Sequence, residues 1–329
     1  MEAKSETVSI KAEAKPKFTI SNLFNSLKEH LNLLLTVFKK TLLIDLFSRW
    51  KFIFGIIFMI ILPIVWLLPQ DASILNDQSS LNEVIGMVHI FFTYMTVLPF
   101  LLIYSSASLI SEEIKMGTML LLVSKPISRG EIMWGKYTAL LFYNLILSVV
   151  SLGIVCLIAF LKYPFNDIIP FFWTQFVFSL IVIAFFGTLT MGLSMVFKNA
   201  KTTVVIPLML LLIMIFLFFI IRPFLMMPTP NGDTYYEAFH VYNYDLGYHF
   251  INLYVWLYET LISQLPEGMI WWLLSWGIYT IEYDEFSPEF EILTKTHYQP
   301  PYISLLIILS FTVIIIIIGF IIYKRRDIN

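Results

Sequence analysis

The chain has 329 residues, of which 58% are hydrophobic and only 13% are charged. A soluble domain carries about one quarter charged residues, so this much apolar surface indicates a surrounding of lipid rather than water. The net charge of −2 offers no basic field for nucleic acid, and the single Cys156 excludes an internal disulfide. We therefore expect a membrane protein with no nucleic-acid partner.

The first 49 residues form two segments ahead of the first long apolar run. Residues 1–19 are polar and mixed in charge, which predicts a disordered tail. Residues 20–49 place apolar side chains at helical spacing, with charged residues such as Lys28 and Glu29 between them. This pattern predicts an amphipathic interface helix along the inner membrane surface, and a soluble helix that packs on a partner is the alternative.

Six segments between residues 50 and 329 are long and apolar enough to cross a bilayer of about 30 Å. They are 52–68, 88–110, 132–160, 172–197, 202–221 and 302–322. All six exceed the length of a membrane-barrel strand, so we expect helices. The predicted fold class is an all-α polytopic membrane protein whose six-span domain covers residues 50–329.

The distribution of basic residues predicts the orientation. An even number of spans puts both termini on one side, together with all 21 Lys and Arg residues except Lys162, Arg222 and Lys295. Basic residues accumulate on the cytoplasmic side of membrane proteins. We therefore expect a multi-pass protein of the cell membrane with both termini in the cytoplasm.

The predicted extracellular loop 223–301 is long and contains two apolar stretches, 251–262 and 269–281, which are each too short to span. Pro266-Glu267-Gly268 separates them, which suggests a re-entrant or interfacial helical hairpin, with a small folded cap as the alternative. Trp271, Trp272 and Trp276 favour the membrane interface, where they could form a lid over an exit.

The loop 111–131 between the second and third spans has the most informative pattern. It leaves the second span through Glu112-Glu113, and Lys125-Pro126 ends a short amphipathic segment because proline disfavours helix in the residue before it. Ser128 and Glu131 then match a capping box, which predicts the start of the third span. The pattern indicates a short helix held between two spans.

This loop resembles the corresponding loop of the ABC-2 type permeases of ABC transporters, which has an acidic pair, a basic residue, Gly-Thr, an apolar run, Ser-Lys-Pro, Ser-Arg, an acidic residue and Gly-Lys. The matching residues are Glu112, Glu113, Gly117, Thr118, Ser124, Lys125, Pro126, Ser128, Arg129, Glu131, Gly135 and Lys136. The resemblance extends to the six-span plan, the N-terminal amphipathic helix and the long last outer loop.

The resemblance implies a permease that pairs with a second copy or a relative and works with separate ABC ATPase subunits, most simply as an exporter. ATP and Mg would be bound by the ATPase, with no cofactor in this chain, and membrane lipid would surround the spans. By the same resemblance, residues 112–123 form the coupling helix. The residues assigned to ATPase coupling are Glu112, Glu113, Lys115, Gly117, Thr118, Lys125, Pro126 and Arg129.

Small polar residues on the third and fourth spans are candidates for a translocation surface, although close helix packing is the simpler explanation. They are Asn144, Ser148, Ser151, Thr190 and Ser194. No predicted span holds a Lys, Arg, Asp or Glu away from its ends, which argues against a secondary carrier or channel that needs buried ionisable groups.

Other chemistry has weaker support. Gly130 to Lys136 imitates a phosphate-binding loop, but Tyr137 stands where Ser or Thr is required. His240, His249 and His297 match no metal-ligand spacing, so we interpret them as exposed loop histidines and expect no metal. An intramembrane or lipid-modifying enzyme is a further alternative, but the outer-loop acids are scattered rather than paired.

Overall fold

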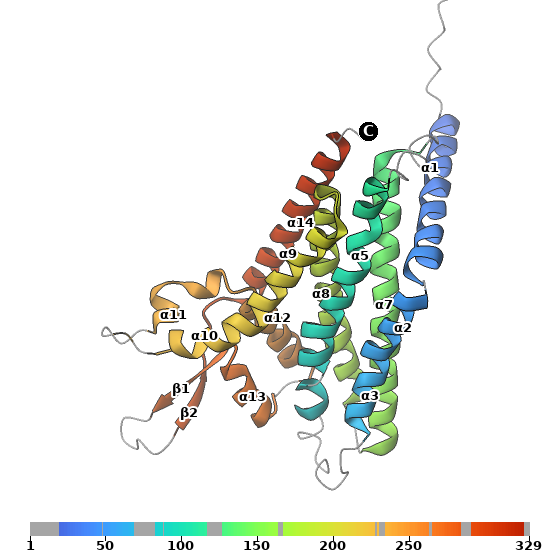
Figure 1. Ribbon diagram of the computed structural model, residues 1–329. Coiled ribbons are helices and arrows are strands. Elements are labelled where there is room, and N and C mark those ends of the chain that lie inside the picture. The colour runs from blue at the N-terminus through green and yellow to red at the C-terminus, as the bar shows by residue number, and fades with distance from the viewer. Residues whose placement is uncertain are drawn as a thin grey trace, which may run out of the picture.

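The computed structural model describes residues 20–47, 49–68, 83–87, 89–116, 127–163, 167–227, 229, 234–262, 265–283 and 291–325. Across these ranges the chain is mostly helical, with one short pair of strands (Figure 1). Four long helices form the bundle: α5 (Leu98–Lys115), α7 (Arg129–Lys162), α8 (Ile168–Val196) and α14 (Pro301–Arg325).

Helix α8 lies at the centre of the bundle and packs against α5, α7 and α14. It is apolar all round its circumference, as expected for a helix that other helices surround. Its crossing with α14 is very close, because a Cβ added to Gly319 would lie 2.6 Å from the carbonyl oxygen of Gly192. Paired glycines allow membrane helices to approach backbone to backbone.

The structure supports a polytopic helical fold but does not confirm six spans. Four helices in the described part of the chain are long and apolar enough to cross a membrane, and there are up to five if two helices that meet at 75° count as one broken span. The four are Tyr94–Lys115, Arg129–Lys162, Ile168–Val196 and Pro301–Arg325, and the bent pair is Leu27–Leu46 with Trp50–Val65.

The predicted span 202–221 is divided among α9 (Ala200–Leu212), the π-helical η4 (Ile213–Leu217) and α10 (Phe218–Leu225). The apolar helix here, Ala200–Ile215, is too short to count as a span. Pro207 lies inside α9, where it removes a backbone donor, and π-helical turns interrupt the regular ladder of hydrogen bonds.

The N-terminal region consists of helical segments with a bend between them. They are α1 (Ile20–Lys40), the π-helical η1 (Thr41–Leu46), α2 (Arg49–Ile56), the π-helical η2 (Ile57–Ile61) and α3 (Leu62–Leu67). A further π-helical segment, η3 (His89–Val97), leads into α5. Phe24 and Leu27 of α1 are 72% and 62% exposed, whereas Val37 is buried against α7. The exposed apolar face is consistent with the membrane-surface helix, which stays a prediction.

The described part of the predicted outer loop 223–301 folds into more elements than the expected hairpin of 251–262 and 269–281. It contains α11 (Tyr235–Ala238), the 3-10 turn η5 (Val241–Asn243), α12 (Leu246–Leu261), α13 (Glu267–Leu274), β1 (Tyr279–Tyr283) and β2 (Glu291–Lys295). The second helix of the predicted hairpin is therefore shorter than expected: α13 ends at Leu274, and β1 pairs antiparallel with β2, with Tyr279 opposite Lys295. Gly277, at φ 73°, turns the chain after α13, and the following aromatic and β-branched residues suit a strand.

The first half of the predicted hairpin, α12, lies inside the protein rather than on its surface. It packs between α8 and α14, with the ring centroid of Phe250 5.2 Å from that of Phe185. Tyr254 likewise lies 5.2 Å from Phe178. The apolar surface of this stretch is thus covered by the bundle, while α10, α11 and the strands project to one side of it (Figure 1).

Candidate functional site

The candidate site lies at one end of the bundle, where α1, the last turn of α5, the first turn of α7 and the last turn of α14 meet (Figure 1). We call it the terminal end. Glu112, Glu113 and Lys115 occupy the last turn of α5, and Arg129 begins α7. Gly117, Thr118, Lys125 and Pro126 lie outside the described residues. The predicted coupling helix 112–123 can therefore be compared only at its start, where its residues belong to α5.

A buried ion pair joins α5 to α7 at the terminal end. Lys136 Nζ lies 2.5 Å from Glu113 Oε2, and the Lys136 side chain is 1% exposed. The same ammonium donates to the carbonyl oxygen of Leu109. Lys40, the last residue of α1, places its Nζ 3.6 Å from Glu113 Oε1. Because a buried ammonium needs charged and hydrogen-bonding partners, Lys136 holds α5 and α7 together, and Glu113 draws α1 to both.

Helix α1 also approaches α7 closely at Gly135. A Cβ added to Gly135 would lie 2.8 Å from Val37 Cβ and 3.1 Å from the carbonyl oxygen of Leu34, which is inside normal contact. Adjacent residues in the sequence thus have two roles. Gly135 allows α1 to approach α7, and Lys136 pairs with Glu113 of α5.

The predicted capping box at the start of α7 is confirmed. Ser128 Oγ accepts from the Glu131 backbone N–H at 3.2 Å, and the Ser128 N–H donates to Glu131 Oε2 at 2.6 Å. The other carboxylate oxygen of Glu131 lies 2.5 Å from His30 Nδ1 of α1. A carboxylate in the first turn also interacts favourably with the helix dipole. Glu131 therefore stabilises the start of α7 and at the same time binds α1.

Arg129 connects the same end to α14. Its Nη1 donates to the carbonyl oxygens of Tyr323 and Lys324 at 3.1 and 3.0 Å. The last carbonyls of a helix have no partner within the helix, so the guanidinium caps the C-terminus of α14. Glu113, Arg129, Glu131 and Lys136 each join two or more helices, which makes the terminal end one linked unit.

Comparison with protein families decides what this helical membrane chain is. The model of a family described as "ABC-2 family transporter protein" matches residues 35–328, and so includes the terminal-end residues of α5, α7 and α14. The chain belongs to the ABC-2 transporter family. It is accordingly an ABC-2 permease, a multi-pass membrane component of a transporter rather than an enzyme. Comparison with curated proteins gives no match.

The phosphate-loop imitation and the histidines have structural explanations in the permease. Gly130 to Lys136 form the first turns of α7, so the segment lacks the irregular glycine-rich backbone that cradles phosphate. Among the residues that the structure describes, no three His, Cys, Asp or Glu side chains gather to hold a metal. The interpretation of His249 as an exposed histidine is wrong, because it is buried with Nδ1 3.0 Å from Ser304 Oγ.

The five residues proposed for translocation are all buried within this single chain. They are Asn144, Ser148, Ser151, Thr190 and Ser194. Ser194 Oγ accepts from the backbone N–H groups of Ile110 and Ser111 at 3.2 and 3.1 Å, which fastens α8 to α5. Ser151 donates to the carbonyl oxygen of Met59. The geometry displays a packing role, and the translocation role stays a prediction.

The three tryptophans of the predicted lid have different surroundings. Trp271 is 45% exposed, Trp272 is half-buried, and Trp276 is buried with its ring 5.2 Å from Arg222 Cζ. Trp276 therefore belongs to the protein core instead of the membrane interface. The positive charge of the Arg222 guanidinium is attracted to the negatively polarised face of the Trp276 indole ring.

Sequence reasoning missed the ion pair beside Trp276. Arg222 and Asp245 are both buried, and the Tyr236 hydroxyl donates to Asp245 Oδ2 at 2.9 Å. Burial and the neighbouring Asp245 carboxylate raise the pKa of Tyr236, so the phenol keeps its proton as a donor. The available signal was Asp245 directly before an apolar helical run, the position of a helix cap, where it accepts from the Tyr248 N–H.

Ionisable residues near the ends of the predicted spans are not all accessible to solvent. Lys136 and Arg222 are near helix ends in sequence, yet both are fully buried. Each is neutralised by a carboxylate from a different helix, Glu113 for Lys136 and Asp245 for Arg222.

Proposed function

We propose that the chain is the permease subunit of an ATP-driven exporter that forms the translocation path together with a second permease copy or relative. Separate ABC ATPase subunits bind ATP and Mg and dock at the terminal end. The observation that carries this proposal is the Glu113–Lys136 ion pair. It joins α5 and α7, the two helices on either side of the loop that resembles the ABC-2 family.

A push on this loop would reach several helices at once. The loop leaves α5 three residues after Glu113 and enters α7 at Ser128, one residue before Arg129. Glu113 passes the displacement to Lys136 and Lys40, and Arg129 passes it to the end of α14. Close-packed, cross-linked elements move as rigid bodies, which is the kind of motion that switches a transporter between states.

Charged side chains at this end could also receive a partner. Asp45, Lys51 and Glu112 line a pocket of about 220 Å³ beside the ion pair, and Lys51 Nζ donates to Ser108 Oγ at 3.0 Å. We place this end in the cytoplasm of a cell-membrane protein, since the basic residues concentrate on the side of both termini. The exposed Trp271 is placed at the opposite membrane surface, where the α13 region would act as the lid.

The test uses the permease reconstituted with its ATPase in lipid vesicles. Lys136→Met with Glu113→Leu replaces the ion pair with apolar groups, which keeps the helices packed but removes the charged linkage. We expect normal membrane insertion, with the coupling between ATP hydrolysis and transport weakened by about 0.5–2 kcal/mol. Lys39→Met, at an exposed position of α1, is the matched control and should leave coupling unchanged. Unchanged coupling in the double variant would contradict the proposed route.

A further inference from the structure

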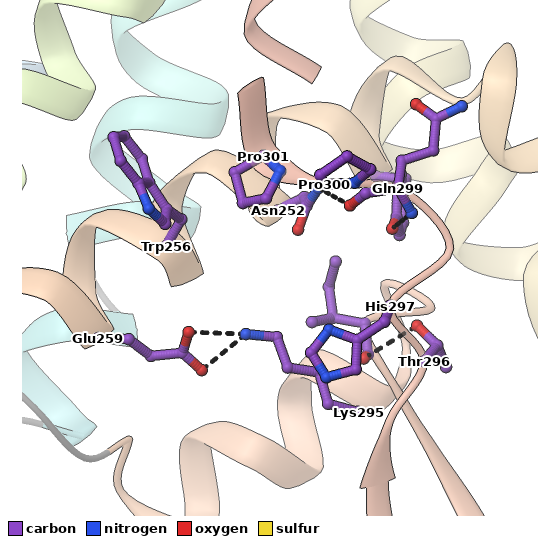
Figure 2. A pocket seen from close by; sticks show the side chains of 11 residues that line it. Asn252, Trp256, Glu259, Lys295, Thr296, His297, Gln299, Pro300 and Pro301 are labelled. Carbon is purple, nitrogen blue, oxygen red and sulfur yellow. Dashed lines mark hydrogen bonds and ion pairs between the residues drawn. The ribbon is translucent and has the colours of Figure 1, made fainter. Parts of the chain in front are cut away.

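A pocket of about 350 Å³ lies between the end of α12, the strand β2 and the start of α14. Figure 2 shows Trp256, Asn252 and Pro301 along one side, and Glu259, Lys295 and His297 along the other. The pocket thus has an aromatic and proline side facing a side that carries both signs of charge. Concave sites with a few convergent polar groups on apolar walls are the usual form of small-ligand sites.

Hydrogen bonds hold the segment that forms the charged side in place. Asn252 Nδ2 donates to the carbonyl oxygen of Gln299 at 3.0 Å, and Thr296 Oγ1 donates to that of Gly277 at 2.9 Å. His297 has φ 46°, a left-handed conformation that is uncommon for a residue other than glycine. Such backbone conformations persist where the surroundings impose them and cluster at functional sites. The pocket is preformed, with His297 fixed on its wall.

An ion pair lies within the pocket and is only partly shielded from solvent. Lys295 Nζ donates to both carboxylate oxygens of Glu259 at 2.7 Å, and the two side chains are 22% and 35% exposed. An exposed ion pair contributes little to stability, so a ligand can open it at low cost. An anion alone would leave Glu259 unpaired next to it, and a cation alone would leave Lys295 unpaired. A ligand with both charges would satisfy both side chains.

We propose that this pocket binds the headgroup of a zwitterionic phospholipid. The phosphate takes the place of Glu259 on Lys295 and also meets His297. The ammonium group of the lipid pairs with the Glu259 carboxylate and lies against the face of Trp256. The Trp256 side chain is 45% exposed and suited to cation–π contact.

The position of the pocket favours a lipid over a free zwitterion. Pro301, which lines the pocket, is the first residue of α14, an apolar helix long enough to span the membrane. Tyr302 and Leu306 follow it on α14 and are 65% and 59% exposed, and Leu309 is 45% exposed. An acyl chain attached to a headgroup in the pocket can therefore run along this surface. Burial of each methylene group of the acyl chain adds to the affinity of a lipid for the protein. A soluble zwitterion has no acyl chain and lacks this contribution.

The experiment measures lipid retention by the full-length permease without any ATPase, so it is independent of the proposed transport function. The purified protein in detergent receives equal amounts of phosphatidylcholine and phosphatidylglycerol, and native mass spectrometry gives the ratio retained. We expect the wild type to prefer phosphatidylcholine. Glu259→Lys should shift the ratio towards the anionic lipid by about tenfold or more, because a second positive charge rejects the ammonium group and attracts the net anion.

Two variants and a soluble competitor complete the test. Asp167→Lys makes the same charge change outside the pocket and should keep the wild-type ratio. Trp256→Leu keeps the ion pair and should reduce phosphatidylcholine retention alone. Unchanged ratios in both Glu259→Lys and Trp256→Leu would overturn the proposal. So would displacement of the lipid by glycerophosphocholine at equal concentration, since that result would assign the pocket to a free zwitterion.

Discussion

Arg222 and Asp245 form a buried ion pair in which Arg222 Nε donates to Asp245 Oδ2 at 2.9 Å. The guanidinium also donates to the carbonyl oxygen of Ser275 at 2.6 Å, and the other carboxylate oxygen caps α12 through the Tyr248 N–H. The pair therefore joins α10, α12 and the end of α13. It organises the part of the permease that projects from the bundle.

Asp245→Asn should strongly destabilise this region. Asparagine keeps the shape and the capping oxygen but leaves the Arg222 charge buried without a counter-charge, which costs about 3–5 kcal/mol. We expect a lower thermal unfolding midpoint in detergent and faster proteolysis of residues 226–295. Glu29→Gln, at an exposed position of α1, is the control and should change neither.

The companion variant separates loss of charge balance from loss of shape. Arg222→Met combined with Asp245→Asn removes both charges, so it should recover most of the stability that Asp245→Asn loses. If the double variant is no more stable than Asp245→Asn, the ion pair is not the main source of the effect.

Gly135→Ala should loosen α1 from α7. The new Cβ would lie 2.8 Å from Val37 Cβ, and overpacking of this kind costs about 1–3 kcal/mol. Protease sensitivity of α1 measures the separation. Gly153→Ala is the matched control in the same helix, because nothing lies within 4 Å of its added Cβ. Equal protease sensitivity of the Gly135 and Gly153 variants would refute the close-approach role.

The buried His249 predicts a loss of stability in acid. Burial lowers its pKa below the usual 6.5, although the Asn243 carbonyl and Asp245 oppose the shift. The unfolded chain then takes up a proton at a higher pH than the folded chain, so stability is complete above pH 6.5 and falls as the pH drops below it. In His249→Gln, the thermal unfolding midpoint should change less with pH over this range than in the wild type. An unfolding midpoint that falls as steeply with acid in His249→Gln as in the wild type would contradict this prediction.

Single cysteines test the orientation. The natural Cys156 is buried, so added thiols can be followed against a low background. Cysteine at Ser5 or Asn199 should react with an impermeant thiol reagent only after the membrane is opened, and cysteine at Asp284 should react in intact cells. The reverse pattern would place both termini outside.

The sequence alone determined the features that depend on residues close together in the chain. Long apolar runs predicted a polytopic helical membrane protein because each run must by itself be long and apolar enough to cross the bilayer. The Ser128–Glu131 capping box was predictable because both partners lie within one helical turn. The loop pattern indicated the ABC-2 family, which the family comparison confirms.

Only the tertiary structure decided which charges are buried and what they bind. Glu113 and Lys136 lie on different helices, as do Arg222 and Asp245, so their spacing in sequence predicts neither contact. The strand pair after α13 likewise depends on Tyr279 pairing with Lys295, which lies 16 positions further along the chain. The sequence of 269–281 alone therefore suggested one apolar segment. The pocket around Glu259 and Lys295 combines three elements and exists only where they meet. Desolvation and long-range pairing depend on the whole fold, which is why local patterns could not reveal these sites.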